Sequence, residues 1–244
     1  KIRGEESFGM LCSEKELTLS EKHEGIIELK STSELGLSVV DILDLNDPII
    51  EIEITPNRGD CLGVRGIARD LATAGMGNLK DLVFKVNEGE FDSIISWKVD
   101  LEQDHKYLCP KIYGRSFTNL ENVESPLWLK NRLIAVDQRP ISSIVDITNY
   151  IMIDIGRPLH AYDIDKIKGT TLRISKSKKG DKFSALNGTT YDLDDNMIVI
   201  SDEQGIDDLA GIMGGERTGV TKNTTRMFLE AAIFDPVSIA NTGR

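Results

Sequence analysis

The spacing of hydrophobic residues predicts a strand followed by a helix in the first third of the chain. Residues 49–55 alternate between apolar and polar side chains after the first two positions, which is typical of a half-buried strand. Residues 61–73 carry apolar side chains roughly on one helical stripe. Asp60 is placed to cap this helix, and Gly75 and Gly77 follow its end.

Helical spacing returns in the middle of the chain. Ser125 as a cap and Pro126 at the first helical position mark the start of a helix that runs to Val136. A second helix is predicted over 143–155, where Gly156 closes it.

Strand-like spacing dominates from Leu172 onward. Asn187-Gly188 is a strong turn signal for a hairpin, and Asp235-Pro236 opens a last helix. Strands are predicted at 94–99, 112–117, 183–186, 189–193 and 197–201. Two helices followed by several strands favour an α+β fold with a mainly antiparallel sheet over alternating βαβ units.

The chain has 244 residues and 40% hydrophobic content, which is enough for two modest domains. We expect a small N-terminal α+β domain over 1–80, a linker over 81–92 and a larger mixed α+β domain over 93–244. The sequence contains neither a signal peptide nor an apolar run near the roughly 20 residues of a membrane span. Because it begins at Lys1 rather than Met, we expect a piece excised from a longer protein.

Three cysteines and three histidines are scattered singly along the chain. Because this spacing matches neither a disulfide framework nor a zinc site, we expect reduced thiols in the cytosol and no metal. The formal net charge of −11 argues against a general nucleic-acid coat. Residues 166–182 are locally basic, however, and form either a solvated hairpin or a local phosphate contact.

The segment 209–216 combines four apolar residues with three glycines. Glycine in a strand interior forfeits packing, so this run predicts a backbone that closely approaches a ligand or another strand. Glu230 lies within the apolar stretch 227–234, where a charge needs a partner or a function. The plainer interpretation is a glycine-rich turn between buried strands, with Glu230 on a solvated face.

Two further candidates lie in predicted loops, where functional residues concentrate. His160 follows the second helix, and no orienting partner for its ring is visible; Arg139 lies in the turn between the two helices. The chain has no nucleophile elbow, P-loop or dinucleotide fingerprint. The residues alone therefore predict a pocket made by the glycine run, Glu230, His160 and Arg139, without naming its substrate. A lone loop histidine is also commonly an idle surface residue.

Several stretches resemble the beta subunits of bacterial phenylalanyl-tRNA synthetases. Residues 2–13 are similar to the end of the family's tRNA-binding OB-fold insert, and residues 55–69 to the remainder of its first domain. The stretches that resemble the family's editing domain, in the same order and spacing, are 143–150, 158–163, 210–216 and 228–231.

The resemblance implies that residues 93–244 form an editing domain, which hydrolyses tyrosine wrongly attached to tRNA(Phe). The family's pocket positions fall on Arg139, His160, Gly214 and Glu230. Two more belong to a threonine-x-alanine stretch that would follow the last residue, so we expect a pocket that is open on one side. This chain departs from the family at Pro140, where serine is frequent, and at Asp207-Asp208, where small apolar residues are usual. The two aspartates change the charge near the pocket.

These residue types suit that reaction. Tyrosine differs from phenylalanine by one added hydroxyl, and the apolar pocket in which phenylalanine is activated cannot strongly reject it. A second site must therefore select for that hydroxyl. Glu230 is expected to accept the phenol O–H, while Gly214 and Gly215 let the ring and backbone amides approach. His160 is expected to orient the attacking water or the terminal ribose, and Arg139 to meet the terminal phosphate or the substrate carbonyl.

The resemblance also implies tRNA(Phe) and the synthetase alpha subunit as partners, in a cytoplasmic α2β2 heterotetramer. ATP and magnesium are expected on the alpha subunit, where tRNA(Phe) is charged, and no cofactor is expected on this chain. One alternative is a non-catalytic tRNA-binding or subunit-docking module, which the basic segment 166–182 motivates. Another is a free-standing editing protein, against which the stretches 1–13 and 49–73 argue.

Overall fold

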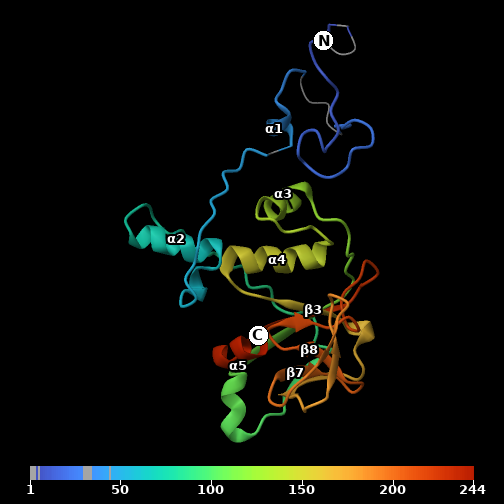
Figure 1. Ribbon diagram of the computed structural model, residues 1–244. Coiled ribbons are helices and arrows are strands. Elements are labelled where there is room, and N and C mark those ends of the chain that lie inside the picture. The colour runs from blue at the N-terminus through green and yellow to red at the C-terminus, as the bar shows by residue number, and fades with distance from the viewer. Residues whose placement is uncertain (1–3, 5, 30–34, 44) are drawn as a thin grey trace. The chain divides into compact units, whose positions relative to one another are not determined.

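The computed structural model describes residues 4, 6–29, 35–43 and 45–244 (Figure 1). It divides into two compact units, Lys1–Asn46 and Asp47–Arg244. The first unit is mostly loop and contains the short helix α1 (Val39–Ile42), which the Ser38 side chain caps. Part of the stretch 2–13 that resembles the OB-fold insert lies outside the described residues. The domain boundaries that we expected at 80 and 92 remain a prediction.

The second unit begins with an extended segment instead of the expected strand. Residues 49–55 join no sheet among the described residues, so the prediction of a strand there is wrong. Alternating side chains favour a strand only when a neighbouring strand supplies the backbone partners. The helix that follows is confirmed as α2 (Val64–Thr73), preceded by the 3-10 helix η1 (Gly59–Cys61).

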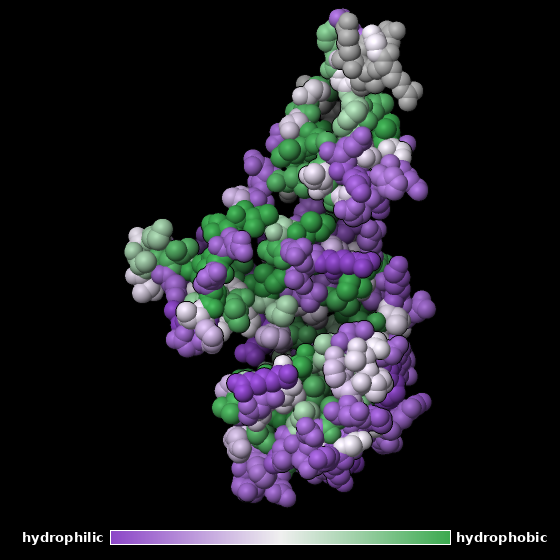
Figure 2. Space-filling view, in the orientation of Figure 1, coloured by the Kyte–Doolittle hydropathy of each residue, from purple (hydrophilic) through white to green (hydrophobic). Residues whose placement is uncertain are grey.

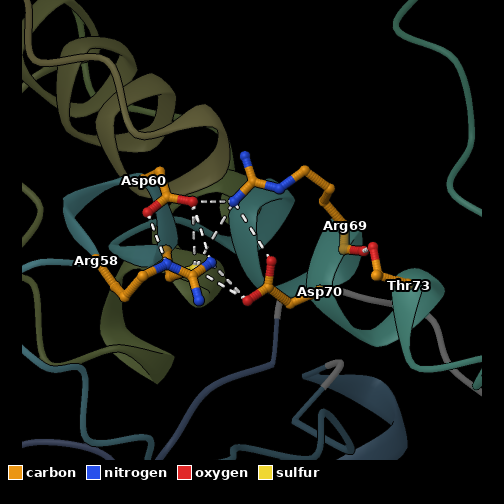
Figure 3. A network of polar contacts seen from close by, with 6 residues as sticks. Arg58, Asp60, Arg69, Asp70 and Thr73 are labelled. Carbon is orange, nitrogen blue, oxygen red and sulfur yellow. Dashed lines mark hydrogen bonds and ion pairs between the residues drawn. The ribbon is translucent and has the colours of Figure 1, made fainter.

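An ion-pair network fixes the corner before α2 (Figure 3). Arg58 donates to Asp60 through Nε at 3.0 Å and to Asp70 through Nη2 at 2.6 Å. Arg69 also pairs with Asp60. The hydrogen bonds from Arg58 hold the pKa of Asp60 well below its usual range. Asp60 is therefore not the helix cap that we predicted, because two guanidinium groups engage its carboxylate and Gly63 occupies the cap position.

Two helices follow in the middle of the chain, α3 (Leu127–Ala135) and α4 (Ser143–Ile155). The predicted bounds of α4 are confirmed, and Gly156 ends the helix in the left-handed region at φ +70°. Ser125 does not cap α3, since Pro126 holds that position. The Ser125 hydroxyl instead donates at 2.6 Å to the buried carboxylate of Asp146 and so links the two helices.

Three sheets build the rest of the unit. A five-stranded sheet has the order β1 (Ser96–Val99), β4 (Thr171–Lys176), β7 (Ile198–Ser201), β8 (Ile206–Leu209) and β9 (Met213–Gly214). A three-stranded sheet has the order β2 (Lys111–Phe117), β10 (Met227–Ile233) and β3 (His160–Asp163). The third sheet is the predicted hairpin of β5 (Lys182–Ser184) and β6 (Thr190–Asp192). The short helices are η2 (Gln103–Leu108), η3 (Ile164–Lys166) and α5 (Pro236–Thr242).

The described strand pairs are antiparallel except for β1 with β4, which confirms an α+β fold with mainly antiparallel sheets. A buried cluster that includes Tyr162, Leu172 and Phe228 joins the five-stranded sheet to the three-stranded sheet. Apolar side chains also reach the surface over α2 (Figure 2), where Val64 and Leu71 are exposed. The main core therefore lies between the sheets, at the junction that holds the candidate site.

Candidate functional site

A cleft of about 410 Å³ opens where β3, the β8–β9 turn and the end of β10 meet. Three of the predicted site residues line it: His160, Gly214 and Glu230. Much of the remaining lining is apolar and includes Ile200, Ala210, Ile212, Met213 and Phe234. A mostly apolar cleft with a few convergent polar groups is typical of a small-ligand site.

Strand register places the polar groups of the cleft. Glu230 on β10 is the Cα partner of His160 on β3, in the three-stranded sheet. In the five-stranded sheet, Asp208 on β8 is the Cα partner of Gly214 on β9. The prediction of a loop at His160 is wrong, because this residue begins a strand. That strand pairs with β10, a partner distant in sequence that local spacing does not reveal.

Close approaches require the two glycines at the end of β9, Gly214 in the strand and Gly215 directly after it. A side chain at Gly214 would strike the His160 ring and would come within 3.0 Å of Leu186 Cδ1. A side chain at Gly215 would strike the backbone oxygen of Asp207. Gly215 lies outside the cleft lining, and its amide donates to Asp208 Oδ1 at 3.0 Å. Gly214 therefore keeps space open beside His160, whereas Gly215 is needed for strand packing.

Glu230 is buried, with only 6% of its surface exposed. The interpretation that places it on a solvated face is therefore wrong. Burial, together with the nearby charge of Asp208, raises the pKa of Glu230 to about 8. The Tyr162 hydroxyl lies 3.0 Å from Glu230 Oε2. No other hydrogen bond to this carboxyl occurs in the described part of the chain, so Oε1 is the oxygen left for a ligand.

Tyr162 and Asp208 are part of this site, although sequence reasoning did not place either there. Tyr162 is fully buried, and its hydroxyl contacts Asp208 Oδ2 as well as Glu230. Burial raises the pKa of Tyr162 well above its usual value, so it keeps its proton. In the sequence, the Asp207-Asp208 pair stands out only as a departure from the family. Asp207 pairs with Arg217, so Asp208 is the aspartate that brings negative charge to the cleft.

The structure supplies an orienting partner for the His160 ring. The ring packs edge-on against Tyr162, with centroids 4.5 Å apart. Its buried Nε2 lies 3.4 Å from Asp208 Oδ1, within ion-pair distance but without the alignment of a hydrogen bond. Since a buried ring nitrogen needs a partner, a small rotation toward Asp208 would satisfy it. That orientation leaves Nδ1 as the nitrogen available to a ligand or water.

Arg139 is exposed in the loop between α3 and α4 and is absent from the described lining of the cleft. The arginine that lines the cleft is Arg157, whose guanidinium donates to the Ala232 carbonyl at 3.1 Å. Sequence reasoning missed Arg157, although it directly follows the glycine that ends α4. The role that we expected for Arg139 remains a prediction.

Local partners occupy much of the basic segment 166–182. Lys182 pairs with Asp192 at 2.8 Å, and Arg173 lies 3.6 Å from Asp100. Lys166 donates to the Gly219 carbonyl. These contacts favour the solvated hairpin over a dedicated phosphate site.

Two carboxylate-rich clusters in the described residues have metal-ligand spacing. Asp60, Cys61 and Asp70 form the first, but Arg58 and Arg69 already neutralise its carboxylates, which makes it unsuited to a cation (Figure 3). The second, at 102–105, is a largely exposed group at the start of η2. Exposed groups of this kind are common without an ion. Separately, no described helix has the length and apolar character needed to cross a bilayer.

Comparisons with known proteins agree with the resemblance drawn from the sequence. A family model described as the B3/4 domain matches residues 108–244. The phenylalanine–tRNA ligase beta subunit of Paramagnetospirillum magneticum is 50% identical across all of this chain, and that of Gluconobacter oxydans is 48% identical. This chain spans 30% and 29% of their lengths.

Among solved structures, an N-terminal fragment of the phenylalanyl-tRNA synthetase beta subunit from Pyrococcus horikoshii is 16% identical. The match covers 77% of this chain and 59% of that fragment, with a TM-score of 0.42. A likeness at this level establishes no shared function.

Proposed function

Because the chain belongs to the B3/4 domain family, we propose that its cleft is a proofreading site that removes tyrosine from mischarged tRNA(Phe). The observation that carries the proposal is the convergence of Glu230, His160 and Gly214 on one mostly apolar cleft. A phenol ring fits such a lining, and the buried carboxyl offers one oxygen for its hydroxyl. The volume of about 410 Å³ lies in the range of small-ligand sites.

Selection for tyrosine follows from the burial of Glu230. Phenylalanine would cover this carboxyl without offering a hydrogen bond, which costs roughly 1–3 kcal/mol for an unsatisfied buried polar group. Tyrosine would donate its phenol proton to Oε1. The bond strengthens when Glu230 is ionised, since charge-assisted hydrogen bonds are about twice as strong as neutral ones. The preference for tyrosine is therefore expected to grow as pH rises through about 8, the pKa of Glu230.

Hydrolysis of an aminoacyl ester requires a placed water and stabilisation of the developing oxyanion. His160 is the residue best placed to position that water, because its ring borders the cleft on the strand next to that of Glu230. Arg157 is the cation that lines the cleft, and it is suited to the substrate carbonyl or to the terminal ribose. Arg139, outside the lining, is assigned to the RNA phosphates instead.

The same proposal covers the partners of the chain. The beta-subunit relatives imply tRNA(Phe) and an alpha subunit as partners, in an α2β2 enzyme of the cytoplasm. ATP and magnesium would serve the charging reaction on the alpha subunit. The proofreading cleft needs neither, since ester hydrolysis is already favourable.

Deacylation of Tyr-tRNA(Phe) by the full-length subunit, assembled with its alpha subunit, tests the proposal. The Glu230→Ala variant should hydrolyse Tyr-tRNA(Phe) at least about tenfold more slowly than wild type, as expected for the loss of a buried hydrogen bond to the substrate. Aminoacylation with phenylalanine is the control and should not change. Equal deacylation by both proteins would reject the proposal and favour a non-catalytic RNA-binding or docking module.

A further inference from the structure

The carboxyl of Asp208 lines the cleft and contacts three neighbouring residues at once. It is 3% exposed, and its Oδ1 accepts a hydrogen bond from the Gly215 amide at 3.0 Å. The same oxygen lies 3.4 Å from His160 Nε2. Its other oxygen contacts the Tyr162 hydroxyl. One buried side chain on β8 therefore contacts the Gly215 amide after β9 and both His160 and Tyr162 on β3.

Counting protons shows how Asp208 is connected to Glu230. The Tyr162 hydroxyl carries one proton but lies within hydrogen-bonding distance of two carboxyl groups, those of Asp208 and Glu230. Each contact needs a proton of its own, so one carboxyl must also be protonated. Both carboxyls are buried, but Glu230 is the better carrier because its described hydrogen-bond partner is the Tyr162 hydroxyl, while Asp208 also accepts a backbone amide and faces the imidazole. The three groups thus form one chain of hydrogen bonds with a shared extra proton.

We propose that Asp208 is a positioning residue of this cleft, which orients the His160 ring directly and the Glu230 carboxyl through the Tyr162 hydroxyl. This inference rests on the proposed proofreading function. Contact with Asp208 holds His160 Nε2, so His160 Nδ1 is left to bind the attacking water. Contact with Tyr162 holds Glu230 Oε2, so Glu230 Oε1 is left to accept the phenol hydroxyl of the substrate tyrosine. The carboxylate of Asp208 would then orient both the residue that positions water, His160, and the residue that recognises the tyrosine hydroxyl, Glu230.

The charge of Asp208 also sets the pH at which the cleft becomes most selective. The titratable and charged groups around Glu230 are Cys109 before β2, His160 and Tyr162 on β3, Asp208 on β8 and Arg157 after α4. Of these, Asp208 is the negative charge that acts with burial to favour neutral Glu230. The substitution Asp208→Asn keeps the shape and removes this charge. Glu230 would then ionise at lower pH, and the preference for tyrosine would rise at lower pH.

The test uses the full-length subunit assembled with its alpha subunit. The rates of Tyr-tRNA(Phe) and Phe-tRNA(Phe) deacylation are measured from pH 6 to pH 9.5. For Asp208→Asn we expect kcat for Tyr-tRNA(Phe) to fall about tenfold with a much smaller change in KM, because a neutral amide orients the His160 ring less firmly than a carboxylate does. The pH midpoint of tyrosine preference should move to lower pH. Asp192→Asn, on the exposed hairpin strand β6, is the matched control.

Tyr162→Phe removes only the linking hydroxyl and tests the Glu230 branch separately. It should reduce the preference for tyrosine over phenylalanine about tenfold, the effect of losing one hydrogen bond to a recognition group. Tyr191→Phe, an exposed tyrosine whose hydroxyl accepts from Asn187, is the control and should keep the wild-type preference. If Asp208→Asn fails to fold, the Tyr162→Phe result decides the inference.

The outcomes separate this inference from the proposed function. If Glu230→Ala abolishes tyrosine preference but Asp208→Asn and Tyr162→Phe match wild type in kcat, preference and pH midpoint, the positioning role of Asp208 is rejected and the proofreading function stands. If Glu230→Ala also leaves Tyr-tRNA(Phe) deacylation unchanged, the proposed function itself fails.

Discussion

Glu230 and His160 lie side by side as Cα partners on β10 and β3. This pairing sets a buried carboxyl beside an imidazole on adjacent strands, at the edge of a mostly apolar cleft. The backbone ladder fixes the positions of both groups, so their separation does not depend on a flexible loop. A rigid arrangement of this kind suits a site that must detect one hydroxyl group.

Glu230 makes the free energy of unfolding depend on pH in a definite direction. Its pKa rises from 4.5 to about 8 on folding, so the folded state keeps a proton that the unfolded state releases between these values. The folded state is therefore expected to lose stability as pH rises from 4.5 to about 8, by at most about 1.4 kcal/mol per pH unit. Glu230→Gln should remove this loss, which chemical denaturation at several pH values would measure.

The matched control is Glu121→Gln, which alters an exposed carboxylate in the loop before α3. It should follow wild type at every pH. A Glu230→Gln profile parallel to that of wild type would show that Glu230 titrates normally in the folded protein.

Gly214→Ala should close the cleft without unfolding the protein. The new methyl group would strike the His160 ring, and the ring would have to turn into the space for the ligand. We expect at least about tenfold weaker tyrosine binding, measured by calorimetry, as is common when a ligand group meets a steric clash. Gly77→Ala adds a methyl group in open space and should bind as wild type does. Unchanged binding by Gly214→Ala would place the ligand elsewhere.

Arg58 should matter for α2 more than for the cleft. Its guanidinium bonds Asp60 and Asp70 at once, a planar arrangement that lysine cannot reproduce. Both Arg58→Ala and Arg58→Lys should increase amide hydrogen exchange in α2 while leaving exchange in β3 and β10 unchanged. Full protection of α2 in Arg58→Lys would show that charge alone holds the corner.

Arg139 and Arg157 should differ in what they bind. Arg157 lines the cleft, so Arg157→Ala should weaken binding of free tyrosine. Arg139 is exposed outside the lining, so Arg139→Ala should raise KM for Tyr-tRNA(Phe) without altering the affinity for free tyrosine. Comparing calorimetry with deacylation kinetics on the two variants checks this. A loss of free-tyrosine binding in Arg139→Ala would bring Arg139 into the cleft.

Local signals in the sequence predicted local structure well. The helix stop at Gly156 and the turn at Asn187-Gly188 operate within a few residues, and both features occur as predicted. The apolar setting of Glu230 left two interpretations open, a buried charge with a function or a solvated face, and the fold shows that the residue is buried. The strand expected at 49–55 was wrong because a strand depends on a partner that spacing cannot supply.

Long-range contacts limited the prediction of the site. Tyr162 and Asp208 are 46 residues apart, and only the packing of two sheets brings them together. The sequence feature that could have pointed to Asp208 is the pair Asp207-Asp208 before the glycine run, because buried carboxylates need partners. The partner of each became clear only from the fold, with Arg217 for Asp207 and Tyr162 for Asp208.

The central claim is that this cleft recognises the hydroxyl of tyrosine through Glu230. Titration of the chain with L-tyrosine and with L-phenylalanine at pH 8.5, followed by calorimetry, tests it most directly. We predict that tyrosine binds at least about tenfold more tightly than phenylalanine, and that Glu230→Ala removes this difference. Equal affinity for the two amino acids in the wild-type chain, or a tyrosine preference that survives Glu230→Ala, would contradict the claim.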